Sequence, residues 1–412
     1  MEIKQKIYNF LKWTEKYAGT DMIYLAQGGF WLTFGKIFEI ILGLGLMIVF
    51  ARFLPKEVFG AYQYILSLTA IIGIFSMSGI NTALIRTVAK GNERMFWPCF
   101  VVRLKWAFLG SLTALLIAGW YGWQQNWQLA LCFLIVAIFL PFINSLTIFL
   151  VFWQGKKRFD LQNKYFIFYN LLGAGLLILT ILLTKNLVLI VFTYFFAFTL
   201  AGAIFFFLTK KEATAGEIEK ETIPYGQHLT AMSVIGSLAA YLDKVILWQL
   251  VGPIAVAIYT FAERPILKLQ ELLPISSLAL PKLSERNVRE IKKRLLEKFF
   301  KLFLLAAGLI LIYISLCPYL FKLLFPAYLN SVFYSQTLAL ILIFSPFYLL
   351  SAALTAEMRK KELYILNFVT PTLKILLLLT LIPLLGIWGI IYANLTANLF
   401  NSILIFYFFK KI

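Results

Sequence analysis

"AAYLDKVILWQLVGPIAVAIYTFAERP", residues 239–265, contains two apolar segments joined at Val-Gly-Pro. Four charged residues interrupt these segments: Asp243, Lys244, Glu263 and Arg264. An Asp, Lys or Arg at the centre of a membrane helix costs ~2.5–3.5 kcal/mol on insertion scales, so such residues face a polar interior instead of lipid. The stretch therefore predicts membrane-spanning helices that surround a polar lumen.

The rest of the chain has the composition of a membrane protein. Of its 412 residues, 61% are hydrophobic and 14% are charged, whereas soluble domains use about 45–50% apolar residues. An apolar run of ~20 residues can cross a membrane as one helix. Twelve such runs lie near 27–51, 59–83, 98–121, 127–152, 162–184, 187–209, 228–251, 254–279, 299–321, 332–356, 364–385 and 387–409. We therefore expect an all-α polytopic membrane protein with twelve transmembrane helices.

The basic residues separate the two sides of the membrane. Loops on the side of the two termini hold 29 Lys and Arg residues, and the opposite loops hold only Arg52, Lys56, Lys185 and Lys322. Because loops rich in Lys and Arg stay in the cytoplasm, both termini are predicted to be cytoplasmic. Residues 1–22 predict a basic amphipathic helix and no signal peptide.

The longest polar stretch, residues 210–226, combines four Glu residues with Ala, Thr and Gly, which is the composition of a flexible linker. It separates six expected spans from six others. We therefore expect an N-terminal six-helix bundle over 1–209, which includes the amphipathic helix, a cytoplasmic linker over 210–226 and a C-terminal six-helix bundle over 227–412.

Two pairs of segments indicate that the halves are repeats. "LPKEVFGAY" at 54–62 aligns with "VGPIAVAIY" at 251–259, and each joins the first two spans of its half. "WQGKKRF" at 153–159 aligns with "AEMRKKE" at 356–362, and each follows a fourth span. Internal repeats of this kind are common in transporters, so we predict a duplicated bundle.

Several classes of function are disfavoured. The net charge is +19, but the basic residues form short clusters between apolar runs, which argues against nucleic-acid binding. The three cysteines have no CxxC spacing and His228 is the single histidine, so we expect no disulfide framework, no metal site, no cofactor and no histidine-based catalytic pair. We therefore expect a protein that is not an enzyme.

Nine charged residues lie inside the expected spans and carry most of the functional information. The basic ones are Lys36, Lys244, Arg264, Lys268 and Lys374, and the acidic ones are Glu39, Asp243, Glu263 and Glu271. Lys36 and Glu39 are three residues apart and can form a local ion pair that lowers the cost of burial. Adjacent residues diverge by about 100° around a helix, so Asp243 and Lys244 cannot neutralise each other along one face.

Arg264, Lys268 and Glu271 share one stripe of a helix. Because like charges four residues apart repel, we expect an anion between the two cations and the opposite wall. The alternative is that this stretch lies near the cytoplasmic interface, where Arg and Lys extend outward to water. Lys374, which follows Pro371, either extends outward in the same way or faces the lumen.

Three segments together resemble Wzx-type polysaccharide flippases of the multidrug/oligosaccharidyl-lipid/polysaccharide exporter superfamily. They are "ILGLGLMIVFARFLPKEVFGAYQY" at 41–64, "LDKVILWQLVGPIAVAIYTFAERP" at 242–265 and "IPLLGIWGIIYANLTANL" at 382–399. The resemblance covers essentially the whole chain. It implies two six-helix bundles around a central cavity that opens to each side in turn, in a bacterial or archaeal cytoplasmic (inner) membrane.

The resemblance also implies a substrate and a set of binding residues. The substrate would be an undecaprenyl-pyrophosphate-linked oligosaccharide, moved from the inner to the outer leaflet for export of a surface polysaccharide such as O-antigen. The other expected partners are membrane lipids and a coupling proton or sodium ion, and the chain is expected to be a monomer. The resemblance places Lys36, Arg52, Asp243, Lys244 and Arg264 near the lumen. The other charges inside the spans complete the candidate substrate-binding residues: Glu39, Glu263, Lys268, Glu271 and Lys374.

Two alternatives remain open. A multidrug or small-molecule cation antiporter of the same superfamily would need an acidic pocket, and the nine intramembrane charges sum to only +1. The balance of basic and acidic residues in the lumen therefore discriminates between the two transporters. A membrane polymerase or ligase would need a large external loop or a cluster of catalytic carboxylates and histidines, and the short external loops argue against it.

Overall fold

The computed structural model describes residues 22–272, 275, 279–280, 283 and 288–411, which form helices and turns without a strand. Eleven helices in this part of the chain are long and apolar enough to cross a membrane, which confirms the expected all-α polytopic fold. The remaining expected span, near 254–279, contains α11 (Pro253–Glu271), a helix of 19 residues with four charged side chains. Part of its end lies outside the described residues. The predicted amphipathic helix over 1–22 lies outside the described residues except for Met22.

The chain divides into two compact units. The first contains the chain up to Met47 together with Ile72–Ala231, and the second contains Ile48–Ile71 together with Met232–Ile412. Two long helices, α2 (Met22–Phe53) and α10 (Thr222–Leu250), each belong partly to one unit and partly to the other. The domain boundaries at residues 209 and 227 that the sequence suggests stay a prediction.

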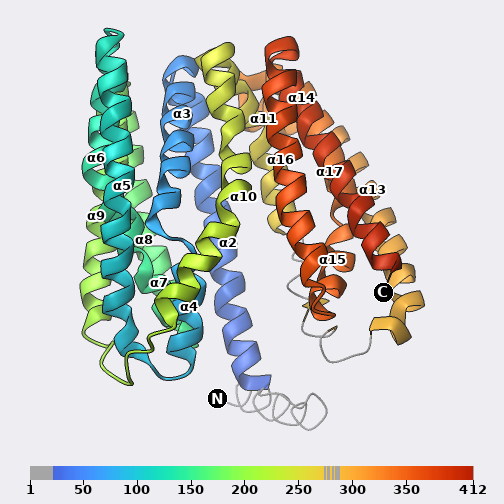
Figure 1. Cartoon of the computed structure of the whole chain (residues 1–412). Coiled ribbons are helices and arrows are strands. Elements are labelled where there is room, and N and C mark those ends of the chain that lie inside the picture. The colour runs from blue at the N-terminus through green and yellow to red at the C-terminus, as the bar shows by residue number, and fades with distance from the viewer. Residues whose placement is uncertain (1–21, 273–274, 276–278, 281–282, 284–287, 412) are drawn as a thin grey trace, which may run out of the picture. The chain divides into compact units, whose positions relative to one another are not determined.

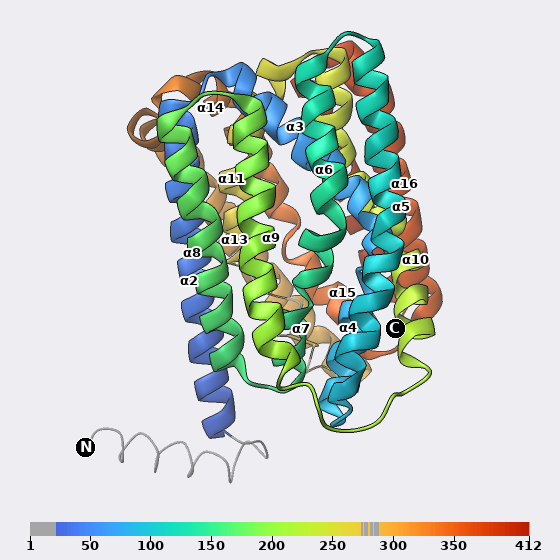
Figure 2. The same ribbon diagram turned by 90° about the vertical axis from the view of Figure 1, so that its left-hand side faces the viewer.

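The first unit is built from long helices that run side by side, as Figures 1 and 2 show for α5, α6, α8 and α9. Its helices besides parts of α2 and α10 are α4 (Gly79–Ala89), α5 (Phe96–Trp123), α6 (Trp127–Leu146), α7 (Ile148–Gly155), α8 (Phe159–Leu183) and α9 (Leu187–Lys210). Aromatic rings fill its interior. The ring of Phe96 lies 5.1 Å from that of Phe206 and 5.3 Å from that of Phe152, and all three side chains are buried.

The helical backbone is interrupted after α3 (Lys56–Ile72), and a buried arginine hydrogen bonds to the interruption. The chain continues through a 3₁₀ turn, η1 (Gly73–Ser76), and Met77 has a positive φ of 55° before α4 begins. Arg103 on α5 donates to the backbone oxygen of Ser76 at 3.3 Å and to oxygens of Asn81 and Asn144. Because a helix break leaves carbonyls without intrahelical partners, the several donors of one guanidinium stabilise this irregular backbone.

The segment between α9 and α10 is held against the turn after α4. The backbone N–H of Arg94 donates to the oxygen of Ala215 at 3.0 Å, and Lys90 forms a 3.1 Å ion pair with Glu219. The hydrogen bond from Lys90 lowers the pKa of the Glu219 carboxyl, so the contact stabilises the fold above the ordinary carboxyl pKa and weakens as the pH falls. Gly216 has a φ of 80°, and a Cβ there would lie 2.3 Å from the oxygen of Gly91. The linker-like composition thus belongs to a segment with defined contacts.

The second unit contains the end of α2, most of α3 and the larger part of α10. Its other helices are α11, α13 (Val288–Leu324), α14 (Val332–Leu338), α15 (Phe347–Ala356), α16 (Lys360–Leu385) and α17 (Ile387–Lys410), with the 3₁₀ turns η3 (Pro326–Ser331) and η4 (Ala339–Phe344). Close packing fixes α11 within it. A Cβ at Gly60 would lie 1.9 Å from the oxygen of Pro253, and the rings of Phe261 and Tyr328 stack at 3.7 Å. These contacts position the charged face of α11.

Candidate functional site

An ion pair joins α10 to α11 inside the second unit. Lys244 Nζ lies 2.7 Å from Glu263 Oε2, and the side chains are 9% and 16% exposed. Asp243, the neighbour of Lys244, is 1% exposed, and its Oδ1 accepts a 2.7 Å hydrogen bond from the backbone N–H of Lys244. The two adjacent charges thus have different partners, as their divergence around the helix predicts.

A buried tyrosine connects the two carboxylates. Tyr259 Oη lies 2.9 Å from Asp243 Oδ2 and 3.0 Å from Glu263 Oε1. The Nδ2 atom of Asn394 on α17 approaches the same hydroxyl at 3.5 Å. A neutral tyrosine has one hydroxyl hydrogen, so it fully satisfies only one of the two carboxylates. The second short oxygen–oxygen contact becomes an ordinary hydrogen bond when that carboxyl carries a proton.

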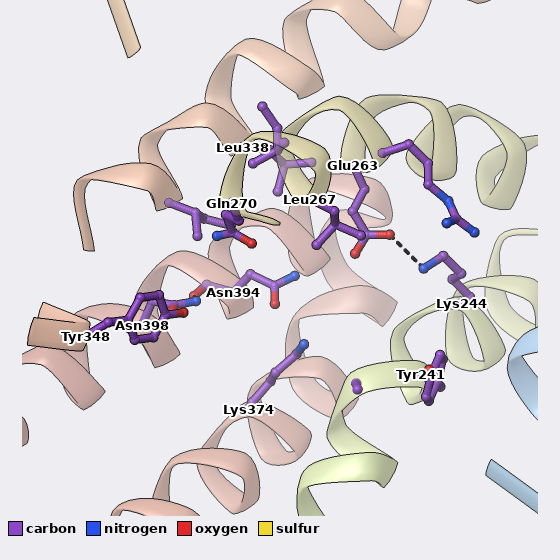
Figure 3. Close-up of a pocket in the computed structure, with 14 residues that line it drawn as sticks. Tyr241, Lys244, Glu263, Leu267, Gln270, Leu338, Tyr348, Lys374, Asn394 and Asn398 are labelled. Carbon is purple, nitrogen blue, oxygen red and sulfur yellow. Dashed lines mark hydrogen bonds and ion pairs between the residues drawn. The ribbon is translucent and has the colours of Figure 1, made fainter. Parts of the chain in front are cut away.

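A cavity of about 500 Å³ lies beside the ion pair (Figure 3). Its lining comes from α10, α11, α14, η4, α15, α16 and α17, and consists of Ala240, Tyr241, Lys244, Glu263, Arg264, Ile266, Leu267, Gln270, Leu338, Ile341, Tyr348, Lys374, Asn394 and Asn398. Lys244, Arg264 and Lys374 are basic, and Glu263 is the acid of this lining. The cavity therefore carries a formal excess of two positive charges.

Arg264 lines the cavity with a side chain whose hydrogen bonding is incomplete among the described residues. Its Nε atom is buried and has no hydrogen-bond partner among the described residues, although the side chain lines the cavity. A buried donor without a partner costs about 1–3 kcal/mol. Lys374 extends toward the same cavity from α16 (Figure 3). An anion in the cavity would therefore satisfy groups that the protein leaves unsatisfied.

Other predicted residues lie away from this cavity lining. Lys268 forms a 2.9 Å ion pair with Glu271, three residues further along α11, and neither residue lines the cavity. Lys36 and Glu39 form a local 3.0 Å ion pair on the part of α2 that belongs to the first unit. Arg52, at the end of α2, donates to the backbone oxygen of Leu323 at 3.3 Å. The structure thus brings together four of the predicted residues in the cavity lining: Lys244, Glu263, Arg264 and Lys374. Asp243 lies outside this lining and contacts Tyr259.

The sequence reading missed the uncharged polar residues of the site. Asn394 and Asn398 both line the cavity, and Asn398 Nδ2 donates to the backbone oxygen of Asn394 at 2.8 Å. Their spacing of four places two amides on one face of a membrane-spanning helix, which is a signal that the sequence contained. Tyr259 was noted only as part of the repeat, and its contacts depend on the packing of α10 against α11.

Within the described part of the chain, no group of three or more His, Cys, Asp or Glu side chains is placed to hold a metal ion. The excess of basic side chains in the cavity lining favours an anionic ligand. Arginine suits this task because its planar group donates two parallel hydrogen bonds to phosphate oxygens.

Comparison with known proteins gives a consistent pattern. The model of a family described as polysaccharide biosynthesis protein matches residues 25–287. A Shigella flexneri protein described as an O-antigen transporter is 22% identical over 313 residues, which cover 70% of this chain and 73% of that protein.

Several solved structures share the fold, and two of them illustrate it. The lipid II flippase MurJ, in an inward closed conformation, superposes with a TM-score of 0.66 at 14% identity and covers 93% of this chain and 87% of its own. An inward-facing multidrug resistance transporter of the MATE family, from the MOP superfamily, gives 0.61 at 15% identity and covers 90% of this chain and 93% of its own. At these identities the two structures show a shared fold and no more.

Proposed function

Because the chain belongs to the family of polysaccharide biosynthesis proteins, we propose that it is a flippase for a lipid-linked oligosaccharide. Its substrate is an undecaprenyl-pyrophosphate-linked oligosaccharide, which moves from the inner to the outer leaflet by alternating access. A relative described as an O-antigen transporter supports a role in export of a surface polysaccharide. The protein acts as a monomer in the cytoplasmic membrane with both termini in the cytoplasm, as the distribution of its basic loops favours.

The observation that carries this proposal is the cationic cavity of the second unit. Lys244 is paired with Glu263, while Arg264 and Lys374 have no ion pair among the described residues. A pyrophosphate supplies several charged acceptor oxygens, and charge-assisted hydrogen bonds are about twice as strong as neutral ones. In this role Arg264 binds the headgroup through its guanidinium, and Lys374 contributes a second charge from the facing helix.

The same charge balance argues against the cation antiporter. A pocket for organic cations needs carboxylates that face the ligand, and this cavity presents three basic side chains and one carboxylate. That carboxylate, Glu263, already lies 2.7 Å from Lys244. An organic cation would therefore meet net repulsion.

The carboxylate pair bridged by Tyr259 supports a proton as the coupling ion. Glu263 is also paired with Lys244, and the single hydroxyl hydrogen of Tyr259 serves both carboxylates, so the pair has room for one additional proton. Asp243 contacts Lys244 on α10 and Tyr259 on α11, and the Tyr259 hydroxyl links it to Glu263 and to Asn394 on α17. Arg264 and Lys374 line the cavity together with Glu263. Gain and loss of this proton change the charge beside the cavity, which links proton movement to headgroup binding.

Transport by the wild-type protein tests this proposal. The protein is reconstituted into liposomes with a fluorescent undecaprenyl-pyrophosphate oligosaccharide, and movement between leaflets is followed by quenching from outside. We expect flipping of the glycolipid and no efflux of ethidium under an imposed pH gradient. Efflux of ethidium without flipping of the glycolipid would instead establish the antiporter.

A further inference from the structure

A second cavity lies in the same unit, on residues that the site above does not use. It has a volume of about 590 Å³ and is lined from α13, η4, α15 and α17. Phenylalanines dominate the lining: Phe299, Phe300, Phe303, Phe344, Phe347 and Phe406. Phe300 is 61% exposed and Ile403 is 58% exposed, so the groove opens on a surface of apolar side chains. This lining favours hydrocarbon as the occupant of the groove.

One end of the groove is strongly basic. Lys410 contributes to the lining and lies 4.8 Å from the ring of Phe406, and Lys411 lies 4.2 Å from the ring of Tyr407. Lys292 on α13 donates to the backbone oxygen of Lys410 at 2.9 Å. Residues 292–301 of α13 read "KKRLLEKFFK", in which five basic residues accompany one Glu. An anionic group at this end would meet several cations.

We propose that this groove binds one anionic phospholipid, with an acyl chain among the phenylalanines and the phosphate beside Lys410 and Lys411. Basic residues next to the cytoplasmic ends of membrane helices attract anionic headgroups, with about 1 kcal/mol for each Lys near the surface. The distribution of Lys and Arg predicts that this end of the unit faces the cytoplasm. The site shares no lining residue with the Arg264 cavity, so the inference does not depend on the proposed substrate.

The size of the groove favours a phospholipid over a polyprenyl carrier. Its lining runs along α17 from Leu399 to Lys410, which is ~17 Å at 1.5 Å per residue. That length matches a fatty acyl tail, whereas an undecaprenyl tail is several times longer than the groove can hold.

Lipid titration by native mass spectrometry tests the site on the whole purified chain. Dioleoyl-phosphatidylglycerol and dioleoyl-phosphatidylcholine have the same tails, so the difference in their dissociation constants isolates the headgroup. We expect the anionic lipid to bind the wild type more tightly, and Lys410→Gln/Lys411→Gln to weaken its binding about tenfold. Lys210→Gln/Lys211→Gln is the matched control, because it removes the same charges from the end of α9 and should leave the affinity unchanged.

A groove-filling variant tests the hydrocarbon part. Ile403→Trp should weaken binding of both lipids, whereas Leu200→Trp, at a 41% exposed position on α9, should weaken neither. Equal affinity of the wild type for the two lipids would overturn the proposal without any variant. It would also be overturned if Lys410→Gln/Lys411→Gln and Lys210→Gln/Lys211→Gln lost the same affinity for phosphatidylglycerol. A third contrary result would be displacement of bound phosphatidylglycerol by undecaprenyl phosphate added at a lower concentration than the phosphatidylglycerol.

Discussion

Lys244 and Glu263 form a 2.7 Å ion pair that links two consecutive helices at the wall of a cavity in the second unit. The pair neutralises the acid of the cavity lining. Arg264 and Lys374 are the cations that then remain for a ligand. The cavity is cationic although the nine intramembrane charges nearly cancel, because Glu39, Asp243 and Glu271 lie outside its lining.

The Lys244–Glu263 pair should show strong thermodynamic coupling. Breaking a buried ion pair from one side leaves an uncompensated charge and costs ~3–5 kcal/mol. We expect Lys244→Met and Glu263→Gln each to lower the melting temperature in detergent, and the double variant to be more stable than either single variant. The matched pair Lys268–Glu271, with side chains 21% and 35% exposed, should couple by no more than about 1 kcal/mol. Additive effects of the two buried substitutions would contradict the proposed pairing.

Asp243 should determine the response of transport to pH. Asn has the shape of a protonated Asp and cannot release the proton, so Asp243→Asn should flip glycolipid at a rate that an imposed pH gradient no longer changes. The wild type should be stimulated severalfold by the same gradient in proteoliposomes. Glu39→Gln serves as the control, because Glu39 is a carboxylate paired with Lys36 on α2. Undiminished stimulation in Asp243→Asn would place the coupling proton elsewhere.

Arg103 should matter for stability and not for substrate binding. Its loss removes the Arg103 donor from the backbone oxygen of Ser76 and from Asn81 Oδ1, whereas the backbone oxygen of Asn144 keeps a donor in Thr147. Each stranded group costs ~1–3 kcal/mol. Arg103→Leu should therefore lower the melting temperature by several degrees or more. Lys105→Leu, two residues away at an exposed position, should leave it unchanged. Equal stability of the two variants would show that Arg103 does not hold the helix break together.

Gly216 should hold the segment between α9 and α10 against the turn after α4. An alanine there would need a left-handed φ of 80° and would place its Cβ 2.3 Å from the oxygen of Gly91, with a strain of ~1–3 kcal/mol. Limited proteolysis should cut Gly216→Ala within 211–221 faster than the wild type. Gly119→Ala, where nothing lies within 4 Å of the added Cβ, is the control. Equal cleavage rates would mean that this contact does not restrain the segment.

Features that depend on local sequence were predictable. Apolar runs of spanning length gave the polytopic helical fold, and the family match confirms the resemblance carried by segments such as 242–265. The local pairing of Lys36 with Glu39 follows from their spacing of three. The same spacing of three also predicts the ion pair between Lys268 and Glu271. With Lys268 paired in this way, Arg264 is the cation of the α11 stripe that is available to a ligand.

Features that depend on how helices pack were not predictable. The contact between Lys244 and Glu263 requires the register of α10 against α11, which no single-helix pattern contains. Arg103 is one of the 29 Lys and Arg residues assigned to the loops on the side of the termini, but its side chain is buried and donates to oxygens beside the helix break at Met77. The sequence allowed Lys374 either to extend to the membrane interface or to face the lumen. The packing of the surrounding helices shows that it lines a cavity.

The most direct test of the account is the rate at which Arg264→Ala/Lys374→Ala flips a fluorescent undecaprenyl-pyrophosphate oligosaccharide in proteoliposomes. A hydrogen bond to a charged group contributes ~1.5–3 kcal/mol, so we predict a fall of at least tenfold, with Arg264→Lys intermediate because it keeps the charge but loses the planar group. Lys268→Ala, on the same helix but outside the cavity lining, should flip at close to the wild-type rate. A wild-type rate in the Arg264→Ala/Lys374→Ala variant would contradict the claim that this cavity binds the headgroup.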